Sequence, residues 1–430
     1  MYDRAAISAV ETQVIADANL DMDPRYGPWL NPPFFAWFFV PLAALPYRQA
    51  ALIFLVLNTA LLIISLKLLT QMVVARSPGE SFAGAASRKD WRTLALVPFL
   101  TLLPLPVLQA MGHQQNTFIS LFLLIVAVTC WRQGKAFSAG AVAGLLFFKP
   151  QLAALFAGVM AVALGWRAIA GLCVTGAALL CVTLVTMPGS LGDFFHQLPP
   201  ILHWLQMESP YNWARQVTPQ SFWRILIQGH VRGETSAPVE ALWWLTSGAI
   251  GMAMISAVRR SLRGPQSQTA RDRLIAAAVV SMPLLMPYYM DYDLLLLAVP
   301  AVLFAAEWVR EPDGITRSDH WLLYAWIAYG LESHFNPGLA GDSRFNLTAP
   351  LLAAIAGLHL WRCVRPRIQL TQPPHATNIT QLNRPAFSRP MDQGFVRPAT
   401  TDVPWCMEAP GQLVSAAVDG PSPCLAPSSR

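Results

Sequence analysis

Residues 48–74 read RQAALIFLVLNTALLIISLKLLTQMVV, an apolar run long enough to cross a lipid bilayer as one helix. Similar runs recur along the chain. Hydrophobic residues make up 54% of its 430 residues, and charged residues make up 13%, against roughly 25% in a typical soluble domain. This balance excludes a disordered chain, a fibre and a conventional soluble enzyme. It predicts an all-α polytopic membrane protein.

About eleven segments are expected to form a bundle of transmembrane helices. They are 48–74, 93–111, 117–131, 136–148, 152–166, 168–187, 239–258, 274–290, 294–309, 321–333 and 345–363. Several are shorter than the ~20 residues of a straight span. Such broken or re-entrant segments are tolerated where irregular backbone is buried in protein. Residues 32–45 are too short to cross, and we expect a re-entrant or interfacial helix there.

Basic residues indicate the orientation of these helices, because cytoplasmic loops carry an excess of Lys and Arg. One set of loops and helix ends carries 17 of the 30 basic residues: Arg76, Arg88, Lys89, Arg92, Arg132, Lys135, Arg167, Arg259, Arg260, Arg263, Arg271, Arg273, Arg310, Arg317, Arg362, Arg365 and Arg367. The opposite side carries roughly half as many over longer loops. We therefore place the first set in the cytoplasm and the second outside, which in a bacterium is the periplasm.

This orientation divides the chain into five parts. They are a periplasmic N-terminal loop 1–31, membrane helices 32–187, a long periplasmic loop 188–238, membrane helices 239–365 and a tail 366–430. The tail is rich in Pro, Ser, Thr and Gln, so we expect it to be disordered and cytoplasmic. The N-terminal loop is polar and has no signal peptide, yet it must lie outside. We therefore expect a first helix upstream of Met1.

A run of polar residues lies between two apolar segments on the outer side. It consists of Gly112, His113, Gln114, Gln115 and Asn116. A helix N-terminus with free amide groups is a natural anion site, so the run is a candidate for binding a phosphate. The structural alternative is a polar turn in which Asn116 caps the following helix.

Lys149, followed by Pro150 and Gln151, is a second candidate on the outer side, where basic residues are scarce. Its ammonium group could face a phosphate at the start of the next helix. The alternative is a lysine that snorkels towards water.

A third cluster contains Tyr288, Tyr289, Asp291, Tyr292 and Asp293 between two helices that leave almost no loop. One aspartate could cap the next helix. Two carboxylates with three tyrosines indicate a sugar or phosphate site lined by aromatic rings.

The long outer loop is the fourth candidate region. Its polar residues include Asp193, His196, His203, Glu208, Tyr211, Asn212, Arg215, Gln220 and Arg224. Loops of this length are usually functional or disordered, and its Trp and Phe residues are typical of helices on a membrane surface. The prolines at 199 and 200 are expected to break any helix that joins His196 to His203, so we predict no metal site.

The chain has no Gly-rich nucleotide loop and no nucleophile elbow. Its basic residues form no aromatic-rich basic face of the kind that binds nucleic acid. We therefore expect no cofactor and no nucleic-acid partner.

Several short motifs follow one another in a specific order along the chain. They are Tyr2-Asp3, Tyr26-Gly27-Pro28-Trp29, Asn31-Pro32-Pro33, Pro41-Leu42-Ala43, Leu45-Pro46-Tyr47, Gly112 to Asn116, Ala139-Gly140, Lys149-Pro150-Gln151 and Pro287-Tyr288 through Tyr292-Asp293. Their order and spacing, over about residues 1–310, resemble glycosyltransferase family 87, bacterial integral-membrane enzymes of the GT-C type.

The resemblance implies a GT-C-like bundle that moves a hexose, often mannose, from a polyprenyl-phosphate carrier to a lipid or glycan acceptor outside the cytoplasmic membrane. It implies an inverting displacement in which a carboxylate takes the acceptor proton and hydrogen-bond donors near the polyprenyl phosphate stabilise the leaving anion. His113, Lys149 and Arg215 are the candidates for the second role. The other residues of the donor site would be Gln114, Gln115, Asn116, Gln151, Tyr288, Asp291 and Asp293.

The catalytic base expected from the resemblance lies some 20 residues before Tyr2-Asp3, upstream of Met1. Asp3 is the weaker candidate for that role, and the chain as written could therefore be inactive. Two other classes stay open: a transporter or flippase of lipid-linked sugars, and a degenerate non-catalytic membrane protein. Transporters also use broken helices and polar sites, but they usually contain internal repeats, and none is visible here.

Overall fold

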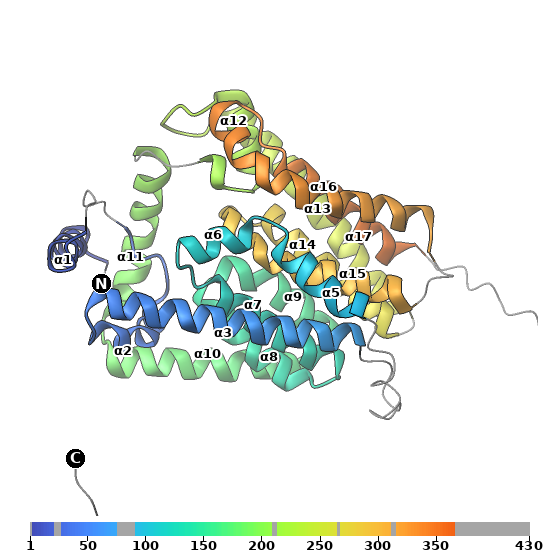
Figure 1. The fold of residues 1–430 in the computed structure, drawn as a ribbon, viewed down its shortest axis with the longest axis horizontal. Helices are drawn as coiled ribbons and strands as arrows, with labels where there is room; N and C mark the ends of the chain where they lie inside the picture. Colours follow the sequence, from blue (N-terminus) through green and yellow to red (C-terminus); the bar gives the residue numbers. More distant parts are fainter. Residues whose placement is uncertain are drawn as a thin grey trace, which may run out of the picture. The chain divides into compact units, whose positions relative to one another are not determined.

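Helices make up almost all of the described chain (Figure 1). The structure is a computed structural model that describes residues 2–20, 27–74, 91–208, 213–264, 267–310 and 315–365, with backbone only at 91–94. The predictions for the loop 75–90 and the tail 366–430 lie outside these residues. Within the described residues, an isolated antiparallel bridge between Gln216 and Met290 is the one β-type pairing.

The described residues in the first half of the chain form eleven helical elements. In order they are α1 (Arg4–Asp17), the 3-10 helix η1 (Pro33–Phe38), α2 (Val40–Ala43), α3 (Tyr47–Val74), α5 (Trp91–Leu102), α6 (Pro106–Gly112), α7 (Thr117–Arg132), α8 (Ala136–Leu145), the 3-10 helix η2 (Leu146–Phe148), α9 (Pro150–Leu164) and α10 (Trp166–Thr186).

The second half begins with the long outer loop, which is itself helical. Its elements are α11 (Ser190–His203), the π-helical turn η3 (Trp204–Glu208), the 3-10 turn η4 (Trp213–Arg215), α12 (Pro219–Gln228), α13 (Ala237–Arg263), α14 (Gln268–Leu285), the 3-10 helix η5 (Asp291–Leu297), α15 (Ala298–Arg310), α16 (Arg317–Asp342) and α17 (Thr348–Val364).

Each predicted membrane segment coincides with a helix or a pair of helices, so the all-α prediction is confirmed. Among the described residues, four helices are long and apolar enough to cross a membrane alone: α3, α10, α13 and the continuous unit η5–α15. The pair α5–α6 makes a fifth if it counts as one span, and it is bent by 66°. Pro104 lies in the break between the two helices and Pro106 is the first residue of α6, as expected for a broken span. The count of about eleven spans remains a prediction.

Close packing of small residues joins α8 to α10. A Cβ atom added at Gly140 would lie 2.0 Å from the carbonyl oxygen of Ala168, and one at Gly171 would lie 2.1 Å from that of Phe137. Only glycine fits at such distances. Gly140 and Gly144 have the spacing that allows membrane helices to approach closely.

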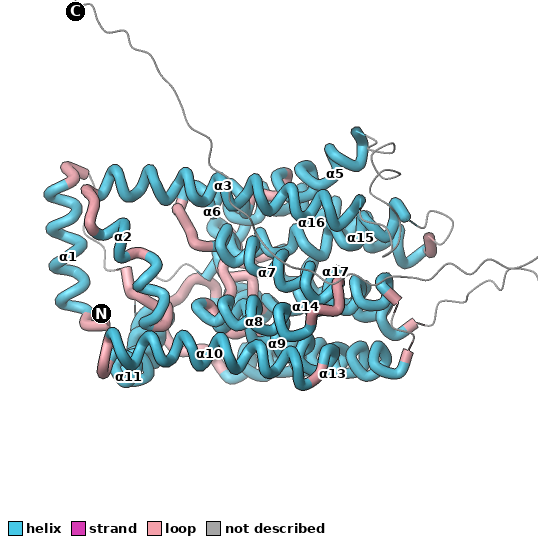
Figure 2. The backbone as a smooth tube through the Cα atoms, turned by 90° about the horizontal axis from the view of Figure 1, so that it is seen from below, coloured by secondary structure: helices cyan, strands magenta, loops and turns pink. Residues whose placement is uncertain are grey.

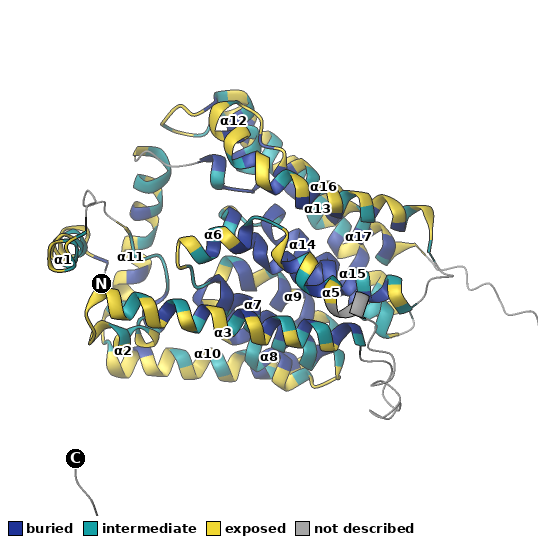
Figure 3. Cartoon of the chain, in the orientation of Figure 1, coloured by how far each residue is buried: buried dark blue, intermediate teal, exposed yellow. Residues whose placement is uncertain are grey.

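The centre of the bundle is α14, in which every residue from Leu274 to Leu284 is buried. It packs against α9, α13, α15 and α17, and its side chains belong to one continuous apolar core. Figure 3 shows this centre as buried and the outward faces of α3 and α10 as largely exposed. Exposed apolar faces of this kind suit contact with lipid chains.

The N-terminal elements lie beside one end of the bundle. Figures 1 and 2 show α1 nearly perpendicular to α3, end-on in the first view and upright in the second. The predicted interfacial segment 32–45 forms the two short helices η1 and α2. Their aromatic rings pack together, with Phe35 stacked on Phe148 at a centroid distance of 4.2 Å.

The expected break at Pro199 and Pro200 is wrong. Helix α11 runs through both prolines to His203, and η3 follows directly. Each proline removes one N–H donor and crowds the preceding turn.

A network of buried ion pairs ties together the helix ends on the side predicted to be cytoplasmic. Arg132 Nε lies 2.9 Å from Asp272 Oδ1, and Arg310 pairs with the same carboxylate at 3.4 Å. Glu307 binds Arg273 and Arg362, and Arg362 also pairs with Asp319 at 2.7 Å. We call these seven residues the inner network.

Candidate active site

Five residues singled out in the sequence come together in one cluster. His113 follows α6, Lys149 precedes α9, Arg215 ends η4, and Asp291 and Asp293 lie in the first turn of η5. They meet because η5 packs against α6 and α7. We call these five residues the outer cluster.

Arg215 and Asp291 form a bidentate ion pair. Arg215 Nε lies 2.9 Å from Asp291 Oδ2, and Nη2 lies 3.0 Å from Oδ1. The side-chain amide of Gln109 donates to Oδ2 at 2.9 Å, and the backbone N–H of Tyr292 donates to Oδ1 at 2.8 Å. Burial favours a lower pKa for Arg215, but the hydrogen bond and charge of Asp291 outweigh it and raise the pKa above its ordinary value. The pair therefore fixes a permanent cation at this position.

The imidazole of His113 forms a hydrogen bond with the Arg215 guanidinium on its solvent-facing side. Its Nδ1 lies 2.7 Å from the carbonyl oxygen of Gln109, which can only accept, so we assign the ring proton to Nδ1. Nε2 then accepts from Arg215 Nη1 at 3.0 Å. The imidazole is exposed, whereas the Arg215 side chain is 24% exposed. Together they form the solvent-facing part of the outer cluster.

Lys149 and Asp293 form the second pair, which is more deeply buried. Lys149 Nζ lies 2.8 Å from Asp293 Oδ1, and the two side chains are 8% and 2% exposed. The hydroxyl of Thr117 donates to the same oxygen at 2.7 Å. The snorkelling alternative for Lys149 is therefore wrong, because its ammonium group points to a buried carboxylate and not to water.

The ring of Tyr292 lies close to both cations. Lys149 Nζ is 5.4 Å from its centroid, and Arg215 Cζ is 5.8 Å from it. Tyr288 is half-buried beside it, and the hydroxyl of Tyr289 donates to the backbone carbonyl of Asp293 at 3.2 Å. An aromatic face next to two cations can bind a sugar and a phosphate together.

A buried asparagine that sequence reasoning missed holds the backbone on both sides of Arg215. Asn346 Nδ2 donates to the carbonyl oxygens of Ala214 and Gln216 at 3.4 and 3.2 Å. Asn336 donates to Asn346 Oδ1 at 3.1 Å. The α16–α17 connection thus fixes the segment that carries Arg215, although it is 130 residues away in the chain.

Gln109 and Thr117 were also missed, and only one of them could be inferred locally. Gln109 precedes His113 by four residues, so the two share a helix face, and that spacing could have found it. Thr117 reaches Asp293 only through packing of η5 on α7.

The remaining predicted residues lie outside the cluster. Gln114 has a left-handed backbone (φ 46°) and closes the turn between α6 and α7, while the carbonyl oxygen of Gln115 accepts from Asn58 at 3.3 Å. Gln151 is half-buried in the first turn of α9. The run forms the turn expected in the structural alternative, and Asn116 stands at the N-cap of α7, but the expected side-chain capping bond is absent. Its φ and ψ of −75° and 12° lack the extended geometry of a cap, and its Oδ1 is buried without a partner in the described structure.

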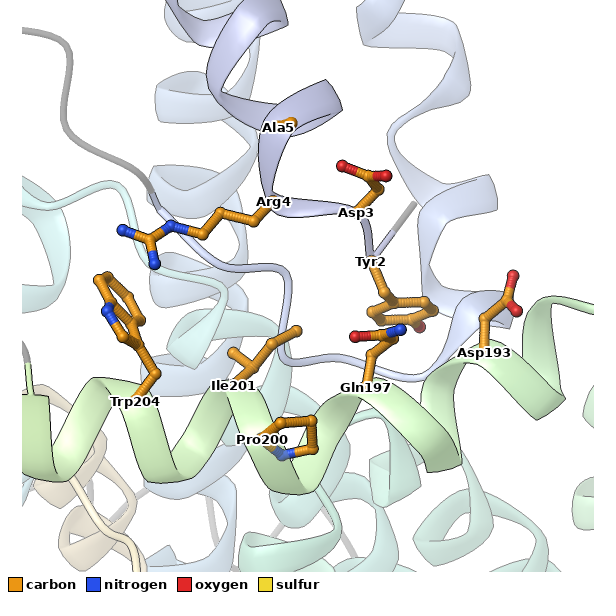
Figure 4. A pocket seen from close by; sticks show the side chains of 9 residues that line it. All are labelled: Tyr2, Asp3, Arg4, Ala5, Asp193, Gln197, Pro200, Ile201 and Trp204. Atoms are coloured by element: carbon orange, nitrogen blue, oxygen red, sulfur yellow. The ribbon is translucent and has the colours of Figure 1, made fainter.

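Asp3, the weaker candidate for a base, lies elsewhere. Its carboxylate caps α1 by accepting from the Ala6 N–H at 3.0 Å. It lines a separate pocket between the start of α1 and α11 that contains no residue of the outer cluster (Figure 4).

The helices and the outer cluster define an integral-membrane protein with an ionic, aromatic-lined site. Residues 29–287 match the sequence model of glycosyltransferase family 87, which is more than half of the chain. The protein therefore belongs to glycosyltransferase family 87, and is a membrane glycosyltransferase. The match includes His113, Lys149 and Arg215 and ends shortly before Asp291. No curated protein and no solved structure matches the chain.

Proposed function

We propose that the protein transfers a hexose, with mannose as the first candidate, from a polyprenyl-phosphate carrier to a lipid or glycan acceptor. The reaction takes place at the outer face of the bacterial cytoplasmic membrane, in a GT-C-type bundle. Family membership supports the glycosyl transfer, and the positive-inside pattern supports the outer face. The donor site is the outer cluster.

The observation that carries this proposal is the Arg215–His113 pair. Asp291 and His113 together accept three of the five N–H donors of the guanidinium, and its orientation is therefore fixed. The side chain is partly exposed, so a phosphate can bind to its remaining donors. Arginine is well suited to this role because its fork matches phosphate geometry.

In the proposed reaction, the bond between the sugar C1 and the phosphate oxygen breaks as the acceptor oxygen bonds to C1. The polyprenyl phosphate leaves with the bonding electrons, and the charge that develops on it is stabilised by Arg215. Lys149 adds a second positive charge close to Tyr292.

The acceptor proton must go to a carboxylate other than those of the outer cluster. Asp291 and Asp293 are each held by a cation, so they orient Arg215 and Lys149. A carboxylate oxygen that already accepts from a cation and a neutral donor has less room to accept the proton of an acceptor hydroxyl. Asp3, the carboxylate that the sequence offers for this step, caps α1 and lines a separate pocket, so we assign it no part in proton transfer at the outer cluster.

Transfer of radiolabelled mannose from polyprenyl-phosphate mannose in proteoliposomes tests the proposal. We expect the wild-type protein to transfer the label, and Arg215→Ala to lower the rate by about 10²–10³-fold, the usual cost of removing one such donor. Arg232→Ala is the matched control, because Arg232 is an exposed arginine of the same outer loop. Transfer from a nucleotide sugar alone, or an unchanged rate in Arg215→Ala, would refute the proposal.

A further inference from the structure

Four exposed arginines lie at the ends of α13 and α17, on the side predicted to be cytoplasmic, and take no part in the inner network. Arg259, Arg260 and Arg263 belong to the last two turns of α13, and Arg365 directly follows α17. Within the described residues, none of the four forms an ion pair. Their positive charges are therefore not balanced by the part of the protein that the structure describes.

The carboxylates on the same side are used inside the protein. Asp272, Glu307 and Asp319 are the carboxylates that the structure describes there, and all three are buried against arginines of the inner network. The described surface at these helix ends therefore carries exposed arginines and no exposed carboxylate. A surface of this kind attracts an anionic partner.

Two of the four arginines continue an apolar face of α13. Met252 and Ile255 are more than half exposed, whereas the opposite side of the helix is buried in the core. Arg259 lies four residues after Ile255, and Arg263 lies four residues further on, so both arginines share the face of Met252 and Ile255. Figure 2 shows α13 along one edge of the bundle. This face presents apolar side chains along the predicted span and positive charge at its inner end.

Exposed tryptophans indicate that this inner end lies at the level of the lipid headgroups. Trp361, in the last turn of α17, is more than half exposed, and the guanidinium carbon of Arg365 lies 5.8 Å from its ring centroid. Trp166 and Arg167 form a similar exposed pair at the start of α10. Tryptophan is enriched where a membrane meets water. Because α17 packs against α13, the pair on α17 sets the same level for the end of α13.

A phospholipid with a negative headgroup fits this face better than other small partners do. A free phosphate would contact the arginines only and leave the apolar part of the face uncovered. A neutral lipid would cover the apolar part and leave the arginine charges unpaired. An anionic phospholipid carries a phosphate and apolar chains in one molecule, so it matches both parts at once.

We propose that the inner end of α13 binds an anionic phospholipid of the cytoplasmic leaflet. The lipid phosphate pairs with Arg259 and Arg263, whose planar forks match phosphate geometry. The acyl chains lie along Met252 and Ile255. This inference concerns the side of the protein opposite to the outer cluster, and it does not depend on the proposed glycosyl transfer.

Native mass spectrometry of the purified protein in a neutral detergent tests this proposal, because it resolves lipids bound one at a time. The probes are phosphatidylglycerol and phosphatidylcholine with the same acyl chains. We expect the wild-type protein to bind phosphatidylglycerol about 10-fold more tightly than phosphatidylcholine. The double variant Arg259→Gln with Arg263→Gln should weaken phosphatidylglycerol binding by about 25-fold, from about 5-fold for each arginine, and leave phosphatidylcholine binding unchanged.

Arg260→Gln is the matched control, because Arg260 is equally exposed but points about 100° around the helix from Arg259. It should keep the affinity for phosphatidylglycerol within about 2-fold of the wild-type value. An equal loss in Arg260→Gln would show a response to total charge and overturn the site. Equal binding of the two lipids by the wild-type protein would overturn it without any variant.

A competition experiment separates a lipid site from a simple anion site. Glycerol phosphate has the charge of the headgroup but no acyl chains, so we expect it to leave bound phosphatidylglycerol in place. Displacement at the same concentration as the lipid would overturn the assignment to a phospholipid. The melting temperature without added lipid should be the same for the wild-type protein and all variants, because the exchanged side chains are exposed.

Discussion

The outer cluster and the inner network both pair basic side chains with carboxylates, yet they differ in access and in placement. The inner network joins helix ends: Asp272 and Asp319 lie near helix N-termini, while Arg132, Arg310 and Arg362 lie in last turns. This placement is favourable for the helix dipoles. The outer cluster instead sits on short 3-10 elements, with His113 exposed and Arg215 partly exposed.

The difference separates two uses of charge in a membrane protein. Glu307 and Arg362 are 8% and 4% exposed, so a ligand has no route to them and their function is to hold helices together. Arg215 is held as tightly by Asp291 but keeps donors for a ligand. We infer that access, and not the number of ion pairs, distinguishes the site from the scaffold.

The largest expected effect comes from breaking the inner network. Glu307→Gln removes the carboxylate charge that pairs with the guanidinium groups of Arg273 and Arg362 in the protein interior. Removing one partner of such a group costs about 3–5 kcal/mol in the free energy of unfolding. Chemical denaturation in mixed micelles measures this loss, and the transfer rate per folded molecule should be unchanged.

The control for this variant is Glu240→Gln, in the exposed first turn of α13. It should change the free energy of unfolding by less than about 1 kcal/mol. A lower transfer rate in folded Glu307→Gln would contradict the division between scaffold and site.

Lys149 lies between the two categories, because it belongs to the outer cluster but is buried. Lys149→Met leaves the carboxylate of Asp293 unpaired and should cost about 3 kcal/mol of stability. The double variant Lys149→Met with Asp293→Leu should recover most of that stability, since an apolar pair of similar size is tolerated. We expect its mannose transfer to stay at least ~10-fold low, by analogy with other lost electrostatic contacts. If the double variant recovers full transfer activity, Lys149 has a structural role only, like the residues of the inner network.

A smaller effect is expected at Asn346, which positions Arg215 without reaching the ligand. Asn346→Leu removes the hydrogen bonds to the carbonyls of Ala214 and Gln216. We expect kcat/KM for the donor to fall by about 10-fold, which corresponds to ~1.4 kcal/mol. Thr348→Val is the control, because Thr348 bonds to Asn336 and Glu332 in the same polar group but not to residues 214–216. Thr348→Val should lose a similar amount of stability but keep its kcat/KM for the donor. An equal fall in kcat/KM in both variants would show that Asn346 does not position Arg215.

The sequence allowed the helices and the members of the outer cluster to be predicted, but not their pairing. Apolar runs located the helices because lipid demands long apolar segments, and polar residues between those runs stood out against them. Whether Lys149 would meet Asp293 or Asp291 depends on how η5 packs on α6 and α7, and no local pattern contains that information. Asn346 was missed for the same reason, since its partners lie in a distant loop.

The short helices in the first half of the bundle have a consequence for biosynthesis. Helices α7, α8 with η2, and α9 each have fewer residues than a bilayer crossing needs. Their polar ends must pack against other parts of the protein. For α8 one such neighbour is α10, which it contacts at Gly140 and Gly171, and this contact forms only after α10 has been synthesised. We expect the insertion machinery to release α7 to α10 into the lipid as one group. A ribosome stalled before residue 166 would then expose a nascent chain that the membrane cannot yet accept.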